Sequence, residues 1–290
     1  MGDARPALDV RTPARRPDLI PLLDALLDDF HPFAVEPLDA VRRRIHFFSA
    51  VDRDDASRAL LRHFGAAGVT AAAVEVPDDD WAARSQADLT AVRIGDIVVA
   101  PPWDVPAEPG GGTLVVIRPS MGFGTGHHAS TRLCLRALQA LPLANRSVLD
   151  VGTGSGVLAI AAARRGATSV VAIDTDRDAV ATALDNVELN GVSGRVRVWC
   201  GDFRRADLQP AAIVLANLNA TLAGRHGAVL AGLVTDGFLV LGGVTAPEEA
   251  AVRGGLGRSA TLVARHAEEE WVALTLAVRG GATRGFTTGC

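Results

Sequence analysis

The chain has 290 residues, 48% hydrophobic and 21% charged, which is long enough for one or two globular domains with a substantial core. Its net charge of −4 excludes the overall basic character of most nucleic-acid-binding domains, and no apolar run approaches the ~18 residues of a membrane helix. Its three cysteines are widely spaced, which fits neither a disulfide framework nor a metal site. We therefore expect a soluble, cytoplasmic protein that binds neither nucleic acid nor a membrane directly.

The first hundred residues predict a small α/β domain that follows an unstructured N-terminal segment. Residues 1–17 carry proline and arginine without any periodicity, so no element is expected there. Apolar spacing then predicts helices over residues 18–30 and 54–64 and strands over residues 41–48 and 69–76. We assign residues 1–100, including a connector that starts near residue 78, to this domain and a role in substrate recognition.

Residues 101–290 predict a doubly wound, mostly parallel sheet of the Rossmann-like class. Strands alternate with helices here, and this order is typical of βαβ units. The expected strands are residues 114–117, 147–151, 169–173, 211–216 and 238–241, and a further strand ends near residue 200. The expected helices are residues 157–165, 177–189 and 222–233. Two final runs, 261–266 and 271–278, predict an antiparallel hairpin. The cap of the second helix is expected at Asp176 and its stop at Gly191.

A glycine loop in VLDVGTGSGVL, residues 148–158, predicts a nucleotide cofactor site. It follows a strand and opens a helix, and Gly152 and Gly154 let the backbone approach a ligand closely. The relaxed dinucleotide fingerprint G-x-G-x-x-A also fits, which leaves a nicotinamide oxidoreductase as an alternative. Asp150 favours S-adenosylmethionine, because a carboxylate would oppose a pyrophosphate but suits a cationic ammonium or sulfonium group.

Two further aspartates follow the next strands. Asp174 comes 22 residues after Gly152, where a carboxylate can accept hydrogen bonds from both ribose hydroxyls. Asp202 is either a contact to the adenine amino group or a simple turn residue. For Asp174 the alternative is a helix cap, a role that Asp176 fits better.

Three motifs in the right order resemble the bacterial ribosomal protein L11 methyltransferases (PrmA-like). They are MGFGTGHHASTRLCL at residues 121–135, ANLNA at residues 216–220 and EEW at residues 269–271. The DDW and PW pairs at residues 79–81 and 102–103 match the connector of that family. The resemblance runs from about residue 78 to residue 278, whereas the first 75 or so residues match only in their α/β character.

The resemblance implies a class I S-adenosylmethionine-dependent methyltransferase that modifies lysine ε-amino groups and the N-terminal α-amino group of a ribosomal protein. It also implies that Thr131, Gly152, Asp174 and Asn217 line the cofactor site. A methyltransferase for another protein lysine or a small amine stays open, as does a relic without activity. The sequence predicts neither the oligomeric state nor the number of methyl groups added.

Asn217 is the candidate catalytic residue. Methyl transfer from a sulfonium needs positioning more than covalent help, and the Asn217 carbonyl can orient and partly desolvate an incoming amine. Related amino-methyltransferases place an aromatic residue after this asparagine, but Leu218 and Ala220 leave no aromatic side chain there, so we expect Phe123 as the wall of the site or as a core residue. The neighbouring His127 and His128 do not predict a metal site, because adjacent histidines do not readily face one ion.

Overall fold

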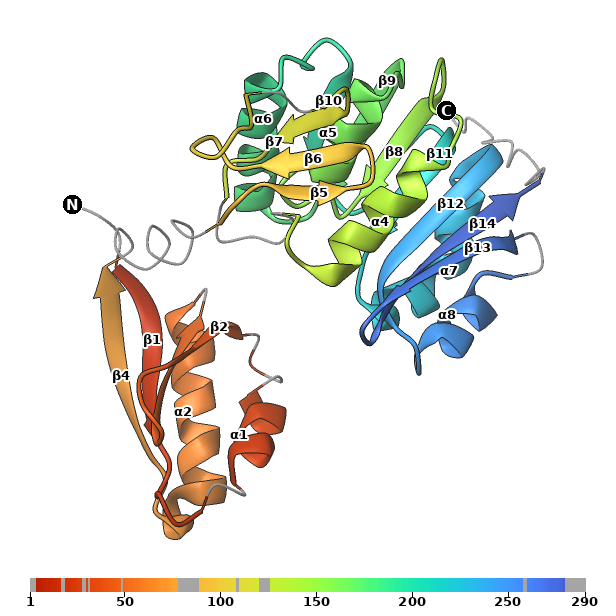
Figure 1. Ribbon diagram of the computed structural model, residues 1–290. Coiled ribbons are helices and arrows are strands. Elements are labelled where there is room, and N and C mark those ends of the chain that lie inside the picture. Colours follow the sequence, from red (N-terminus) through yellow and green to blue (C-terminus); the bar gives the residue numbers. More distant parts are fainter. Residues whose placement is uncertain are drawn as a thin grey trace, which may run out of the picture. The chain divides into compact units, whose positions relative to one another are not determined.

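A computed structural model of the chain describes residues 4–16, 19–27, 30, 32–47, 49–77, 89–107, 110–119, 126–257 and 260–279. The chain divides into two compact units, Met1–Asp88 and Leu89–Cys290, and each is described by itself (Figure 1). The expected boundary at residues 100 and 101 lies later than this division. The reason is that the segment after Leu89 forms two strands, β5 (Val92–Ile94) and β6 (Ile97–Ala100), that pair within the second unit.

The first unit is an antiparallel four-stranded sheet with helices. In chain order its elements are β1 (Ala4–Arg11), α1 (Ile20–Leu27), β2 (Pro32–Pro37), β3 (Arg42–Phe47), α2 (Ala50–Phe64), the 3₁₀ turn η3 (Gly65–Ala67) and β4 (Thr70–Pro77). The strand order is β2-β3-β1-β4. Leucines of α1 and α2 pack on the inward-facing residues of β1 and β3 and form a small core. The α/β character expected for this unit is therefore present.

The expectation of an unstructured lead is wrong for residues 4–11. These residues form β1, which pairs with β3 on one side and β4 on the other. Leu8 and Val10 alternate towards the core, and the outward Asp9 pairs with Arg44 at 2.6 Å. The alternation of apolar and polar residues is short and is surrounded by prolines and arginines, so it does not stand out in the sequence. The strand forms because β3 and β4 pair with it on both sides.

The second unit is built on seven strands of the described chain. They are β8 (Ser147–Val151), β9 (Ser169–Asp174), β10 (Val196–Cys200), β11 (Ala211–Asn217), β12 (Val234–Thr245), β13 (Ala260–Glu268) and β14 (Trp271–Val278). Their order is β10-β9-β8-β11-β12-β14-β13, and all neighbours are parallel except those involving β14. The expected mostly parallel sheet and the closing hairpin are both confirmed.

Helices cover both faces of this sheet (Figure 1). One core contains α4 (Ala129–Gln139), α5 (Val157–Arg164) and α6 (Arg177–Leu189), and the other contains α7 (Ala220–Gly232) and α8 (Glu249–Gly255). All seven residues from Val157 to Ala163 are buried, because the small alanines let α5 lie close to the strands. The predicted cap at Asp176 is confirmed by its bond from the Asp178 amide at 2.9 Å, and Gly191 ends α6 with a φ of 64°.

A small three-stranded sheet completes the unit. β5 pairs antiparallel with β6, and β6 pairs in parallel with β7 (Thr113–Val116). The far edge of β7 meets no strand in the described part of the chain. The Val116 amide of β7 instead donates to the side chain of Asn190, the residue that follows α6, and the Arg118 amide just beyond β7 donates to Asn186 of α6.

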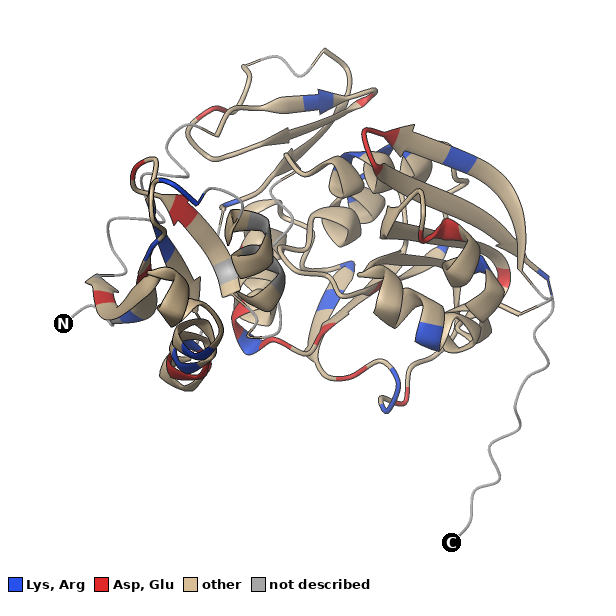
Figure 2. Ribbon diagram, turned by 90° about the horizontal axis from the view of Figure 1, so that it is seen from below, with Lys and Arg blue, Asp and Glu red and all other residues tan. Residues whose placement is uncertain are grey.

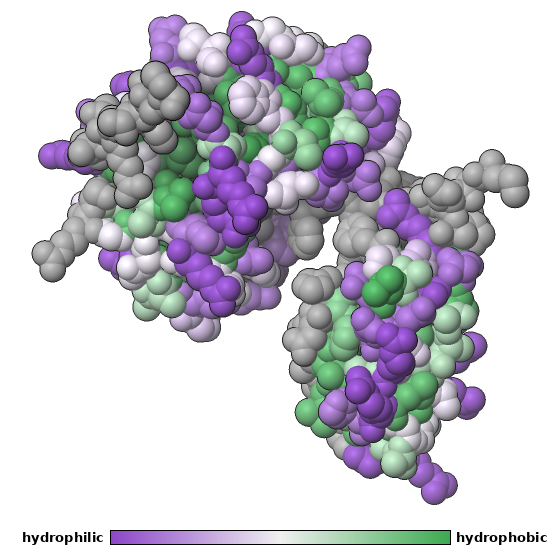
Figure 3. Space-filling view, turned by 180° about the vertical axis from the view of Figure 1, so that it is seen from behind, coloured by the Kyte–Doolittle hydropathy of each residue, from purple (hydrophilic) through white to green (hydrophobic). Residues whose placement is uncertain are grey.

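The surface carries both signs of charge. Figure 2 shows acidic and basic residues interspersed along the described ribbon of each unit. On the face shown in Figure 3, polar and apolar residues are mixed over the smaller unit. The apolar residues there do not form one continuous area. Among the described residues, no helix has the length and apolar character needed to cross a membrane.

Candidate active site

The predicted site residues follow the carboxyl ends of three adjacent parallel strands. β8 lies between β9 and β11, although β11 comes two strands later in the chain than β9. The chain therefore reverses its direction across the sheet between β8 and β11, and ligands of doubly wound sheets bind at such a point. The glycine loop follows β8, Asp174 ends β9 and Asn217 ends β11.

The glycine loop requires glycine at its turns. Gly152, Gly154 and Gly156 have φ values of 70°, 53° and 84°, a region that side chains with a Cβ rarely adopt. A Cβ at Gly152 would lie 2.5 Å from the Leu218 Cδ2 atom. The Gly152 amide donates to the Ile173 carbonyl at 2.9 Å, which ties the loop to β9. The loop therefore needs glycine for its backbone conformation and, at Gly152, for its close contact with Leu218.

Asp174 joins the end of β9 to this loop. Its Oδ2 atom accepts from the Gly154 amide at 2.9 Å, and its Oδ1 atom accepts from the Asp176 amide at 3.1 Å. The side chain is thereby held in one position at the edge of the loop. Each oxygen keeps a lone pair, so the carboxylate can also accept from a ligand hydroxyl.

Asp150 holds the loop from beneath. Its side chain is fully buried, and its Oδ2 atom accepts from the Thr153 hydroxyl at 2.7 Å and the Ala159 amide at 3.1 Å. The Oδ1 atom has no hydrogen-bond partner among the described residues. Burial, the largest effect, raises the pKa of the Asp150 carboxyl to about 7. The immediate partners of this carboxyl group are therefore Thr153 of the loop and Ala159 of α5.

A hydrogen bond joins the side chains of Thr131 and Asn217. The Asn217 Nδ2 atom donates to the Thr131 hydroxyl at 3.3 Å, so α4 and the end of β11 are joined beside the glycine loop. The Asn217 Oδ1 atom is covered and has no partner among the described residues. A Cβ at Gly242 would lie 3.0 Å from that oxygen and would overlap the Cys134 sulfur. Gly242 thus makes room for the Asn217 amide, a role the sequence analysis did not anticipate.

Comparison with known proteins assigns the family. A family model described as ribosomal protein L11 methyltransferase (PrmA) matches residues 42–279. The chain belongs to this family. The ribosomal protein L11 methyltransferase of Geobacter sulfurreducens is 38% identical over 264 residues, which cover 86% of this chain and 85% of the relative. That of Deinococcus radiodurans is 39% identical over 177 residues, covering 57% of this chain and 65% of the relative.

A solved structure agrees in fold. The ribosomal protein L11 methylase of Lactobacillus delbrueckii subsp. bulgaricus superimposes with a TM-score of 0.60 at 22% identity, over 66% of this chain and 100% of that one. The predicted family, class I fold, enzyme class and cofactor are thereby confirmed: this chain is an S-adenosylmethionine-dependent methyltransferase. The roles of individual residues stay predictions.

The residues at the switch point fit that cofactor. The glycine loop has the positive φ values of a tight turn, and the Asp174 carboxylate at its edge can accept from ribose hydroxyls, as predicted. Four of the predicted cofactor residues, Gly152, Gly154, Asp174 and Asn217, follow the ends of β8, β9 and β11, and Thr131 joins them through Asn217. The fold therefore brings residues from separate sequence motifs together at this end of the sheet.

Replacing Asp150 by asparagine should change how stability depends on pH. Because the folded-state pKa is raised from 3.8 to about 7, the folded wild type holds an extra proton between these values and loses stability as pH rises through them. An asparagine at this position would not titrate, so urea unfolding at pH 5 to 8 should show the wild type losing up to ~1.4 kcal/mol per pH unit relative to Asp150→Asn. A difference that is constant with pH would contradict the burial of an ionising carboxyl.

Asp150→Ala provides the comparison for this measurement. Alanine has no oxygen to accept from the Thr153 hydroxyl and the Ala159 amide. In Asp150→Asn the side-chain oxygen can still accept from both groups. We expect Asp150→Ala to be destabilised by roughly 1–3 kcal/mol relative to Asp150→Asn at every pH.

The two histidines have structural partners. His127 Nε2 lies 3.0 Å from the Thr90 carbonyl oxygen, and His128 packs edge-on against Trp271 with ring centroids 4.8 Å apart. No group of three or more potential metal ligands occurs in the part of the chain that the structure describes. The motif around Thr131 predicts a helix that begins at Ser130 or Thr131, but α4 begins at Ala129, because the His128 side chain caps it by accepting from the Ser130 amide.

Other predicted residues lie elsewhere. Asp202 accepts from the Arg204 amide at 2.9 Å and pairs with the Arg204 guanidinium, which agrees with the turn alternative, while the adenine contact stays a prediction. The Arg204 hydrogen bonds lower the pKa of the Asp202 carboxyl to about 2. Phe123 and the rest of residues 121–125, like the connector residues 79–81, lie outside the described residues.

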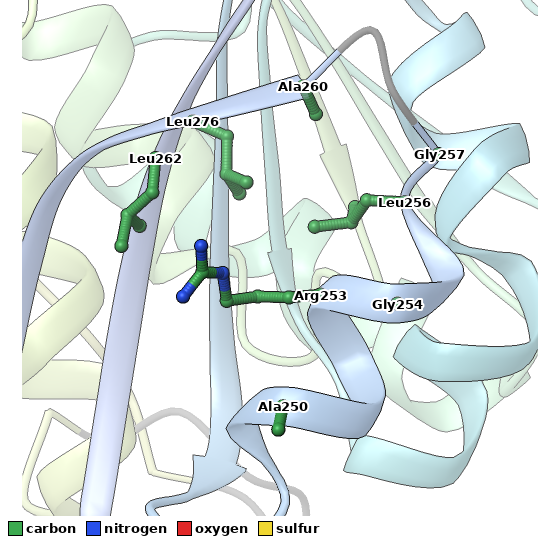
Figure 4. Close-up of a pocket in the computed structure, with 8 residues that line it drawn as sticks. All are labelled: Ala250, Arg253, Gly254, Leu256, Gly257, Ala260, Leu262 and Leu276. Atoms are coloured by element: carbon green, nitrogen blue, oxygen red, sulfur yellow. The ribbon is translucent and has the colours of Figure 1, made fainter.

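A pocket on the far part of the sheet is separate from this site. It lies between α8 and the β13–β14 hairpin, and Figure 4 shows Arg253 extending from α8 towards Leu262. Its lining residues are Ala250, Arg253, Gly254, Leu256, Gly257, Ala260, Leu262 and Leu276. None of the predicted cofactor residues belongs to it.

Proposed function

We propose that this enzyme methylates amino groups of ribosomal protein L11, namely lysine ε-amino groups and the N-terminal α-amino group, in the cytoplasm. The names of the curated relatives support the acceptor. Among the site residues, the Thr131–Asn217 pair beside the glycine loop carries the proposal. It provides a polar, uncharged amide where an acceptor amine can meet the cofactor.

The chemistry requires positioning of a neutral amine. S-adenosylmethionine supplies an electrophilic methyl group, and the amine must present a lone pair although a free lysine has a pKa near ~10.4. A side-chain carbonyl accepts from the N–H of the amine and aims its lone pair, without a charge that would favour the ammonium form. Asn217 supplies such a carbonyl at the end of β11.

The Asn217 amide has to turn to do this. In the structure its oxygen faces Gly242, and its nitrogen faces the Thr131 hydroxyl. A rotation by 180° exchanges the two atoms, and a hydroxyl can donate to oxygen as well as accept from nitrogen. Thr131 therefore keeps a hydrogen bond in both positions and would hold the oxygen towards the acceptor.

The test is transfer of a labelled methyl group to purified ribosomal protein L11 of the same organism. This enzyme contains no lysine, so any labelled lysine must belong to the acceptor. L11 with its amino groups acetylated beforehand is the matched control and should take up no label, because an amide nitrogen has no free lone pair for the methyl group. Mass spectrometry of L11 should locate the label on lysine side chains or the N-terminus.

Two results would overturn the proposal. One is labelling of another protein in a ribosomal extract while L11 stays unlabelled, which would favour the alternative of another protein lysine. The other is label in L11 at a group other than an amine.

A further inference from the structure

The glycine loop is held by three side chains from three different elements. Asp150 of β8 accepts from the Thr153 hydroxyl, and Asp174 of β9 accepts from the Gly154 amide. The next residue, Ser155, is bonded through its carbonyl oxygen, to which Asn186 of α6 donates from Nδ2 at 3.0 Å. Consecutive loop residues are thus fixed from the strand below, the neighbouring strand and the covering helix.

Asn186 has a second partner outside the loop. Its Oδ1 atom accepts from the Arg118 amide at 2.8 Å, just beyond the end of β7. The side chain is fully buried and uses its donor and its acceptor at the same time. An asparagine is suited to this position because a carboxylate lacks the donor and an aliphatic side chain of similar size lacks both groups.

We propose that Asn186 is a positioning residue for cofactor binding: by bonding the Ser155 carbonyl and the Arg118 amide together, it sets the place of the glycine loop against the small sheet. The close packing of α6 on the loop supports this role. A Cβ at Gly156 would lie 3.3 Å from the Cβ of Ala183, which precedes Asn186 by one helical turn. Because α6 and the loop are in van der Waals contact here, a shift of α6 at Asn186 would also displace the loop backbone.

Asn190, which caps the C-terminal end of the same helix, is the matched control. It is 5% exposed, and its amide bonds the Val116 amide and carbonyl of β7 at 2.9 and 2.6 Å. Its remaining bond goes to the Asn186 carbonyl within the helix, and none of its described bonds reaches the glycine loop. Asn190 bonds the end of β7 and Asn186 bonds the residue Arg118 just beyond it, but only Asn186 also bonds the loop.

The experiment compares Asn186→Asp with Asn190→Asp in the full-length enzyme. In each variant the acceptor oxygen is kept and the amide donor becomes a carboxylate oxygen, which in Asn186→Asp faces the Ser155 carbonyl. We expect Asn186→Asp to raise the dissociation constant for S-adenosylmethionine about tenfold or more, and Asn190→Asp to change it less than about threefold. Both melting temperatures should fall, and turnover at saturating cofactor should stay within about threefold of the wild type.

Asn186→Ser serves as the second variant, since it removes the bond to the Ser155 carbonyl without adding charge and also removes the bond from the Arg118 amide. Hydrogen exchange of the loop amides 153–156 should be faster in Asn186→Ser than in Asn190→Ser. Equal loss of cofactor affinity in the Asn186 and Asn190 variants, or unchanged affinity in folded Asn186→Ser, would overturn the proposal. Because calorimetry measures cofactor binding directly, the result is independent of whether L11 is the acceptor.

Discussion

Asp174→Ala should raise the dissociation constant for S-adenosylmethionine by roughly 100-fold. The change removes the acceptor of the Gly154 and Asp176 amides and, under the ribose assignment, the acceptor of the ribose hydroxyls. Hydrogen bonds to a charged group are worth about 1.5–3 kcal/mol each, and about 1.4 kcal/mol is tenfold in affinity. Calorimetric titration of the purified variant measures this directly.

Asp176→Ala is the control for that titration. This exposed aspartate lies two residues further on and caps α6 through the Asp178 amide, so its loss should cost about 1 kcal/mol of stability. We expect its cofactor affinity to stay within about threefold of the wild type. Unchanged affinity in Asp174→Ala would remove the ribose assignment, and equal losses in both variants would attribute the effect to the β9–α6 turn as a whole.

Asn217→Ala should lower turnover on the order of 100-fold or more while cofactor affinity falls much less. The alanine cannot orient the acceptor amine, and it leaves the Thr131 hydroxyl without its partner. Removal of one positioned polar group from an active site has costs of this size. Single-turnover methyl transfer at saturating cofactor separates this effect from binding.

Asn219→Ala is the matched control for turnover. Asn219 lies on the same turn and caps α7 by accepting from the Leu222 amide at 2.8 Å. Its loss should reduce stability by about 1 kcal/mol and leave methyl transfer nearly unchanged. Wild-type turnover in Asn217→Ala would contradict the catalytic assignment, because positioning of the amine would then not depend on this side chain.

The sequence by itself predicted the elements that build the sheet of the second unit and the residues at their ends. Buried parallel strands are short apolar runs, and the cofactor residues follow directly after them, so β8 with Gly152, β9 with Asp174 and β11 with Asn217 could be located by local pattern alone. The motif around Thr131 added the family, which the comparisons confirm.

Other features depended on contacts between distant segments. β1 is a strand because β3 and β4 pair with it on both sides, and its prolines and arginines concealed the alternation of Leu8 and Val10. Gly242 is needed because the Asn217 amide and the Cys134 sulfur lie where its Cβ would be.

Tertiary structure also decided what the polar side chains of the site do. Asp150, predicted from its place before the glycines to face a cation, is buried and bonded to Thr153 and Ala159, and its burial raises its pKa. Asn186 lies in the interior of α6, where asparagine has no periodic signal, and its two partners are 68 and 31 residues away. Local patterns therefore determined which backbone carries the cofactor site, whereas long-range hydrogen bonds, which no local pattern encodes, decided how that backbone is held.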